Sequence, residues 1–149
     1  TTTTQLLESS MASTRRSGST LCFVMIDIDC FKKVNDRYGH PAGDQVILAL
    51  ARILKQQLRI SDVVGRYGGE EFALVLQDVT PEKAAELVNR LREDFARLSF
   101  SGNNMVFSCT FSAGIAVFPK HISLEKLREA SDQALYQAKR NGRNQVVVV

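Results

Sequence analysis

The sequence predicts an α+β fold, in which a central, mainly antiparallel sheet of five strands is flanked by helices. Apolar runs rich in strand-forming residues alternate along the chain with segments whose apolar residues recur at helical spacing. Two of the apolar runs are joined by Gly68-Gly69, which is a strong hairpin signal and makes those two strands antiparallel. The 149 residues suffice for one domain with a substantial core, so we read residues 1–149 as a single domain.

The first half of the chain predicts a helix, a strand and two further helices. Residues 5–18 have the pattern of a helix end, and the four threonines before them are expected to be the remnant of a tag or linker. Residues 21–28 are a continuous apolar run, which is typical of a strand buried on both faces. A short helix is expected over 30–39, with Asp29 as its N-terminal cap, and a longer one over 40–58.

The second half predicts a hairpin, two helices and two more strands. In order these are strands over 62–67 and 71–77, a helix begun by Thr80 and Pro81, a strand over 106–118, a helix from Ser123 to near Gly142, and a strand over 145–149. The hairpin glycines are expected to adopt positive φ, and the strand over 106–118 has one apolar face and one small, polar face. This order indicates a ferredoxin-like βαββαβ core with additions and with helices on one face.

The composition argues against several classes of protein. The 19 basic and 16 acidic residues give a mild positive charge without basic clusters among aromatic residues, so no nucleic-acid partner is expected. That balance suits a small, highly anionic ligand such as a nucleotide. No run is long enough to span a membrane and no secretory signal is visible, so we expect a cytoplasmic domain without membrane contact. Cys22, Cys30 and Cys109 form no CxxC pair and are expected to be reduced thiols.

Three carboxylates stand where strands are expected to end. Asp27 ends the first apolar strand, while Glu70 and Glu71 follow the hairpin glycines with no lysine nearby in the sequence. In a βαββαβ sheet the first strand and the hairpin are neighbours, so Asp27 is expected to approach Glu70. Converging carboxylates suit Mg²⁺, which takes one or two of them and fills its other positions with water and phosphate oxygens. The alternative is that hairpin glutamates are simply solvated, although burying the unpartnered Asp27 would be costly.

Several polar side chains suit a nucleotide but have ordinary structural explanations as well. Lys139 and Arg143, four residues apart across a helix end, either share one anion or complement the helix dipole. Lys32 lies at the start of a helix, where backbone N–H groups can hold phosphate. Asn35 and Asp44 are suited to reading a base edge, but each taken alone fits a turn or a cap.

Four segments taken together resemble one family. They are RYGGEEF from Arg66, DIDCFKKVNDRYGHPAGD from Asp27, TFSAGIA from Thr110, and ALYQAKRNGRN from Ala134. Their order and spacing resemble the GGDEF family of diguanylate cyclases, of whose signature GGEEF is an accepted variant, and they cover nearly the whole chain. The resemblance implies a fold related to nucleotidyl cyclase and polymerase palm domains. It also implies a homodimer that condenses two GTP into cyclic di-GMP and releases two pyrophosphates.

The resemblance also assigns roles to individual residues. Asp27 and Glu70 would be ligands of Mg²⁺, or of Mn²⁺, with help from the Ile28 carbonyl and with two ions in each active site. Glu71 would lie beside the metals and the attacking 3′-hydroxyl. The residues expected around GTP are Phe31 and Lys32 along the phosphates, Asn35 and Asp44 at guanine, Gly68 and Gly69 beside the ligand, and Lys139 and Arg143 on the β- and γ-phosphates.

A further site is implied by Arg59 and Asp62, an RxxD string separated from Gly68 by five residues. In the family this string is an inhibitory site for cyclic di-GMP, where the arginine forks onto guanine or phosphate, and Arg90 matches a secondary contact. The alternative is that RxxD is a common string without a function.

The sequence departs from the family pattern at two places. The family's DxLTxLxNRR segment, which supports Arg66, does not occur in this sequence, and Cys30 stands where an aromatic residue or histidine is usual.

The main alternative function is a catalytically weak receptor for cyclic di-GMP or GTP. A cyclase that makes another cyclic nucleotide is the third reading, against which Asp44 favours guanine.

Overall fold

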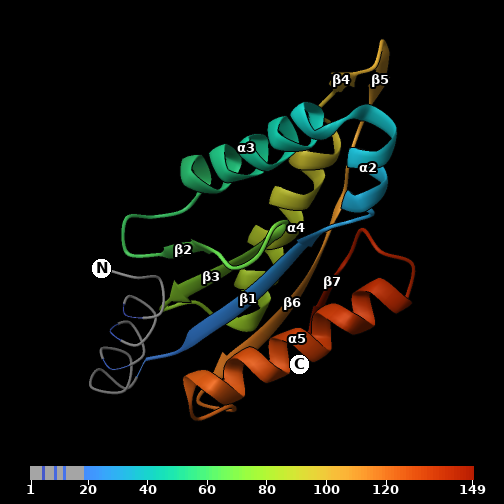
Figure 1. Ribbon diagram of the computed structural model, residues 1–149. Coiled ribbons are helices and arrows are strands. Elements are labelled where there is room, and N and C mark those ends of the chain that lie inside the picture. The colour runs from blue at the N-terminus through green and yellow to red at the C-terminus, as the bar shows by residue number, and fades with distance from the viewer. Residues whose placement is uncertain (1–4, 6–8, 10–11, 13–18) are drawn as a thin grey trace.

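The computed structural model describes residues 19–149 together with Gln5, Ser9 and Ala12, so most of the helix expected over 5–18 lies outside the described residues. The strands and helices are β1 (Leu21–Ile28), α2 (Phe31–Tyr38), α3 (His40–Gln57), β2 (Val63–Arg66), β3 (Glu71–Gln77), α4 (Pro81–Ala96), β4 (Phe100–Gly102), β5 (Met105–Phe107), β6 (Phe111–Phe118), α5 (Leu124–Arg140) and β7 (Val146–Val148). The main sheet has five strands in the order β2-β3-β1-β6-β7 (Figure 1). Its pairs are antiparallel except for β6 with β7, which confirms the predicted α+β class and mainly antiparallel sheet.

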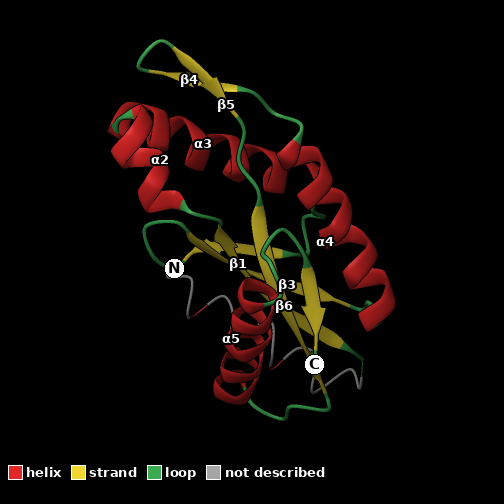
Figure 2. Cartoon of the chain, turned by 90° about the vertical axis from the view of Figure 1, so that its right-hand side faces the viewer, coloured by secondary structure: helices red, strands yellow, loops and turns green. Residues whose placement is uncertain are grey.

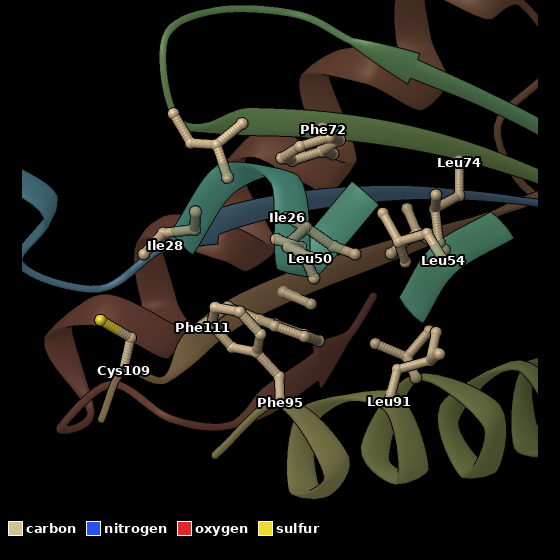
Figure 3. Close-up of a cluster of buried hydrophobic side chains, with 14 of the residues drawn as sticks. Ile26, Ile28, Leu50, Leu54, Phe72, Leu74, Leu91, Phe95, Cys109 and Phe111 are labelled. Atoms are coloured by element: carbon tan, nitrogen blue, oxygen red, sulfur yellow. The ribbon is translucent and has the colours of Figure 1, made fainter. Parts of the chain in front are cut away.

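Helices cover both faces of this sheet. Successive residues of β1 point to opposite faces, and its even-numbered residues from Cys22 to Ile28 pack into a core shared with α3 and α4 (Figure 3). Leu21, Phe23 and Met25 point the other way, into a second core beneath α5 (Figure 2). The expectation of helices on one face only is therefore wrong. Because both faces of β1 are apolar, each of them needs its own cover.

The β2–β3 hairpin is longer than the two-residue connection that was expected. Its loop runs over residues 67–70, and the Tyr67 N–H donates to the Glu71 carbonyl at 2.8 Å. Neither Gly68 nor Gly69 has a positive φ, so the expected conformational reason for these glycines is wrong. A Cβ at Gly69 would meet nothing within 4 Å, which leaves open space beside this turn.

The segment expected as one strand over 106–118 is divided into β5 and β6. β6 is buried on both faces, and its small, polar face is the surface against which α5 packs. A Cβ at Gly114 would overlap the Ser131 carbonyl oxygen and the Leu135 nitrogen, so the lack of a side chain allows this close approach. The described helices include none that is long and apolar enough to cross a membrane.

The β4–β5 hairpin was not predicted. It turns at Asn103 and Asn104, both with positive φ, and packs against the end of α2. Asn103 donates a 2.9 Å hydrogen bond to the Arg37 carbonyl, and the rings of Tyr38 and Phe107 stack with their centroids 3.8 Å apart. This small hairpin thus supports the helix that follows β1.

Candidate active site at the ends of β1 and β3

The structure brings the backbone positions of the three carboxylate residues together. Asp27 lies opposite Glu71 in the antiparallel β1–β3 ladder, and the Ile28 N–H donates to the Glu70 carbonyl at 3.3 Å. Residues directly opposite each other in such a ladder have side chains on the same face, so Asp27 and Glu71 face the α5 side. The expected approach of the first strand to the hairpin is confirmed.

The electrostatics of this cluster favour a cation. Burial raises the pKa of Asp27 from 3.8 to about 6; Lys139 opposes that rise, and Glu70, Glu71 and Asp29 add to it. Burial likewise raises the pKa of Glu71, with Asp132 and Glu70 adding to the effect. Because these carboxylates resist ionisation together, a cation placed among them would be bound favourably.

A lysine does reach this cluster, contrary to the expectation from the neighbouring sequence. Lys139, near the end of α5, places its Nζ 2.8 Å from Asp29 Oδ1 and 3.6 Å from Asp27 Oδ1. Its partners lie about 110 residues earlier in the chain, and only the packing of α5 on β1 and β6 brings them together. The ammonium charge partly balances the cluster and stands beside the carboxylates.

Asp29 is a buried hydrogen-bonding centre and not the cap of α2. The cap position belongs to Cys30, which has a left-handed backbone conformation with φ of 56° and makes no side-chain capping bond. Asp29 is 6% exposed, and it accepts from Thr110 Oγ1 and Ser112 Oγ, both at 2.7 Å, from Lys139 Nζ, and from the Asn144 N–H at 3.0 Å. Burial acts to raise the pKa of Asp29, but the bonds from Lys139, Ser112 and Thr110 outweigh it and lower that pKa.

The residues expected at guanine gather where α2 meets α3. The turn between these helices passes through Gly39, whose φ of 93° is a conformation that favours glycine. A Cβ at Gly43 would overlap Asn35 Oδ1 and would lie 3.2 Å from the Phe31 ring, so both side chains lie against this glycine. Asp44 follows it and is exposed, which places the two polar side chains at one edge.

The chain after α5 adds Arg143 to a hollow that Asp29 also lines. Arg143 lines a hollow of about 390 Å³, together with Lys33 and Arg37 of α2. Arg143 and Asn144 both have left-handed backbone conformations, with φ of 65° and 50°. The Arg143 N–H donates to the Ala138 carbonyl at 2.9 Å, which ties this turn to the last turn of α5.

The glycine turn beside the carboxylates is held by an arginine. Arg66 Nη2 donates to the Gly69 carbonyl at 2.7 Å, and its Nε is 3.2 Å from the Gly68 carbonyl. The side chain of Arg66 therefore fixes the loop that presents Glu70.

The RxxD string forms a separate site. Arg59 Nη2 lies 3.0 Å from Asp62 Oδ1 and Nε lies 3.3 Å from Oδ2, and Nη2 also donates to the Gln77 carbonyl. The Asp62 side chain is 1% exposed, whereas that of Arg59 is 52% exposed at the edge of a hollow of about 300 Å³. Arg90 is exposed on α4.

The sequence model of the family described as "Diguanylate cyclase, GGDEF domain" matches residues 1–145. This chain belongs to the GGDEF family. Two curated relatives are the diguanylate cyclase DgcP of Pseudomonas aeruginosa, 41% identical over 142 residues, and the probable diguanylate cyclase DgcT of Escherichia coli, 42% identical over 132 residues. These matches cover 95% and 85% of this GGDEF domain but only 21% and 29% of the two relatives, so the chain spans less than a third of either protein.

Solved structures agree with this assignment. The GGDEF domain of DgcB from Caulobacter crescentus, in complex with c-di-GMP, superposes with a TM-score of 0.90 at 32% identity, over 95% of this chain and 82% of that one. The active GGEEF domain of a diguanylate cyclase from Vibrio cholerae gives a TM-score of 0.86 at 35% identity, over 94% and 89% of the two chains. The similarity thus covers both the fold and the GGEEF variant of the signature.

The oxygen donors in this GGDEF domain suit a hard cation that also keeps several water or phosphate ligands. Among the residues that the structure describes, no three histidine, cysteine or carboxylate side chains cluster closely enough to chelate a metal unaided. Asp27 and Glu70 offer oxygen donors, and Mg²⁺ characteristically combines one or two carboxylates with water and phosphate oxygens. The residues present therefore fit Mg²⁺ better than they fit an ion enclosed wholly by protein.

Proposed function

We propose that this GGDEF domain is a diguanylate cyclase, which condenses two GTP molecules into cyclic di-GMP and releases two pyrophosphates. The observation that carries the proposal is the convergence of Asp27, Glu70 and Glu71, in which burial and the neighbouring carboxylates raise the pKa of Asp27 and of Glu71. Asn35 and Asp44 lie near Gly43 where α2 meets α3, Lys139 lies beside Asp27, and Arg143 lines a hollow beside Asp29. The names of the relatives support the same activity.

We infer that Asp27 and Glu70, with the Ile28 carbonyl, hold two Mg²⁺ ions, for which Mn²⁺ can substitute. Bound there, such ions would activate the attacking hydroxyl and balance charge on the phosphates. Glu71 lies on the same face as Asp27, and burial raises its pKa, which supports the proposal that it accepts the 3′-hydroxyl proton. Phosphoryl transfer depends chiefly on positioning and on charge stabilisation, which the protein side chains supply.

GTP would lie between the two groups of polar residues. Asn35 and Asp44 would read guanine, and the Asp44 carboxylate is suited to accept from the N–H groups of that base. The triphosphate would run past Phe31 and Lys32, beside the open turn at Gly68 and Gly69, toward Lys139 and Arg143. Lys139 is now bonded to Asp29 and lies near Asp27, so it can reach a phosphate with little movement.

A homodimer follows from the chemistry that we propose. Each protomer has one such cluster and would hold one GTP, whereas the product joins two nucleotides. Each 3′-hydroxyl must therefore attack the α-phosphate held by the other protomer, which two-fold pairing of identical surfaces allows. GTP is a cytoplasmic metabolite, so we expect the domain on the cytoplasmic side.

We further propose that cyclic di-GMP inhibits the enzyme by binding at Arg59 and Asp62, with Arg90 as a secondary contact. Asp62 already orients the Arg59 guanidinium, which remains half-exposed for a guanine or a phosphate. The same feature favours the second candidate function, a weakly catalytic receptor for cyclic di-GMP. Relatives of this fold, including the DgcB domain, have been solved with that dinucleotide.

The test is to incubate concentrated domain with GTP and Mg²⁺ and to measure cyclic di-GMP and pyrophosphate, with Glu70→Gln as the inactive control. We expect both products from the wild type and neither from the variant. If no cyclic dinucleotide forms even when dimerisation is forced by a fused coiled coil, the cyclase proposal is wrong. Binding of cyclic di-GMP without turnover would then establish the receptor function.

A further inference from the structure

The turn that carries Arg143 is held in an unusual conformation. Arg143 and Asn144 are consecutive residues other than glycine with φ of 65° and 50°, in a region that such residues adopt only when their surroundings hold them there. The turn immediately follows α5, and its residues line the hollow that they share with Lys33 and Arg37. The contacts that fix this turn therefore fix the backbone from which the Arg143 side chain projects.

Three groups from distant parts of the chain hold Asn144. Its N–H donates to Asp29 Oδ2 at 3.0 Å and to Ser112 Oγ at 3.1 Å. Its side-chain Oδ1 accepts from Arg92 Nη1 at 2.8 Å. The first two contacts belong to the buried network around Asp29, whereas the third comes from α4, outside that network.

Arg92 is itself oriented for this contact. Its Nε donates to Asn89 Oδ1 at 3.0 Å, and its Nη2 lies 3.7 Å from Glu93 Oε1, so neighbours on the same helix fix the guanidinium. The side chain is 18% exposed and reaches a partner 52 positions later in the chain. Arg97, which follows the last residue of α4, differs because it is 73% exposed and bonds Asp94 near the end of that helix.

We propose that Arg92, acting through Asn144, is a positioning residue of the triphosphate site. It holds the 142–144 turn so that Arg143 faces the hollow beside Asp29, where the terminal phosphates of the nucleotide would lie. The inference rests on the proposed function, because it takes a nucleoside triphosphate as the ligand. Arg92 does not line that hollow, so its effect reaches the ligand only through the turn.

The test compares ligands that contain the terminal phosphates with one that lacks them. Affinities of a non-hydrolysable GTP analogue, GMP and inorganic pyrophosphate are measured by calorimetry for the wild type, Arg92→Ala and the control Arg97→Ala. We expect Arg92→Ala to weaken the GTP analogue and pyrophosphate about tenfold, the loss associated with one charge-assisted hydrogen bond. GMP affinity, the unfolding midpoint to within a few degrees, and all affinities of Arg97→Ala should be unchanged.

Asn144→Ala supplies an independent measurement, because it removes the same contact from the other side. Arg92→Ala and Asn144→Ala should each weaken pyrophosphate binding, and combining them should add little. Equal losses for GMP and the GTP analogue would indicate general damage and overturn the inference, as would unchanged pyrophosphate affinity in Arg92→Ala. Either result leaves the cyclase proposal intact if the wild type makes cyclic di-GMP, whereas a wild type that binds none of the three ligands would overturn both.

Discussion

Asp27 lies half-buried beside other carboxylates, and we expect Asp27→Asn to stabilise the metal-free domain while abolishing turnover. Burial raises the pKa of Asp27 in the folded state, so folding takes up a proton between the ordinary pKa of 3.8 and about 6. Over that range the folded state binds more protons than the unfolded state, and stability falls as pH rises. Below pH 3.8 the carboxyl is neutral in both the folded and the unfolded state, and it does not destabilise the fold. Above pH 6 it is ionised in both states, and the full loss of folding stability is present.

The size of the effect follows from the same two values. One pKa unit corresponds to about 1.4 kcal/mol, so the difference between 3.8 and about 6 corresponds to roughly 3 kcal/mol at pH 8. This value already includes the attraction of Lys139, which opposes the rise. An asparagine has the same shape without the charge and should recover most of this free energy. A bound Mg²⁺ ion should reverse the order, because it stabilises the ionised aspartate and not the amide.

The assay is urea denaturation of the wild type and Asp27→Asn at pH 8 and pH 4, each with EDTA or with excess Mg²⁺. We expect Asp27→Asn to be more stable by about 3 kcal/mol at pH 8 in EDTA, with the gain largely gone at pH 4. The control Glu86→Gln changes an exposed carboxylate of α4 and should alter little. An Asp27→Asn domain no more stable than the wild type at pH 8 in EDTA would refute the reasoning.

Three further changes test other parts of the site. Asp29→Ala leaves the Lys139 ammonium without its closest partner and should lower the free energy of unfolding by about 3–5 kcal/mol, measured by urea denaturation. Arg59→Ala should abolish inhibition by added cyclic di-GMP while the initial rate without product is unchanged, measured as pyrophosphate release. Gly43→Ala adds a Cβ that overlaps the Asn35 amide, so KM for GTP should rise, although alanine in a helix adds up to about 1 kcal/mol of stability.

Each of these has a control and an outcome that would contradict it. For Asp29→Ala the control is Glu86→Ala, and a loss below about 1 kcal/mol would show that the buried network contributes little. For Arg59→Ala the control is Arg52→Ala on the exposed side of α3, and retained inhibition would place the product elsewhere. For Gly43→Ala, an unchanged KM would mean that Asn35 does not read the base.

The part of the site predicted from the sequence is the part that depends on neighbouring strands. Asp27 ends an apolar run and Glu71 follows a glycine turn, so a sheet that pairs the two strands brings these carboxylates together. The sequence also implied that a helix would cover the second face of the sheet, although this was not expected. The run over 21–28 is apolar at consecutive positions, and such a strand needs cover on both sides.

The rest depends on contacts between distant residues, which no local pattern shows. Asp29 was expected to cap a helix, because its partners Thr110, Ser112 and Lys139 come at least 81 residues later. The sequence did contain one signal for the β4–β5 hairpin, because the pair Asn103-Asn104 tolerates the positive φ of a tight turn. Its strands have only three residues each, too few for alternation to be recognised.

The network around Asp29 also orders events during synthesis of the chain. A ribosome adds residues one after another, and Asp29 emerges long before Lys139 and the Asn144 N–H that complete its hydrogen bonds. The hydrogen bonds of this aspartate cannot be completed until residue 144 has left the exit tunnel. A nascent chain therefore carries its guanine-reading and carboxylate residues before the centre around Asp29 is complete. We expect competence for GTP only after the end of α5 and the following turn have packed against the sheet.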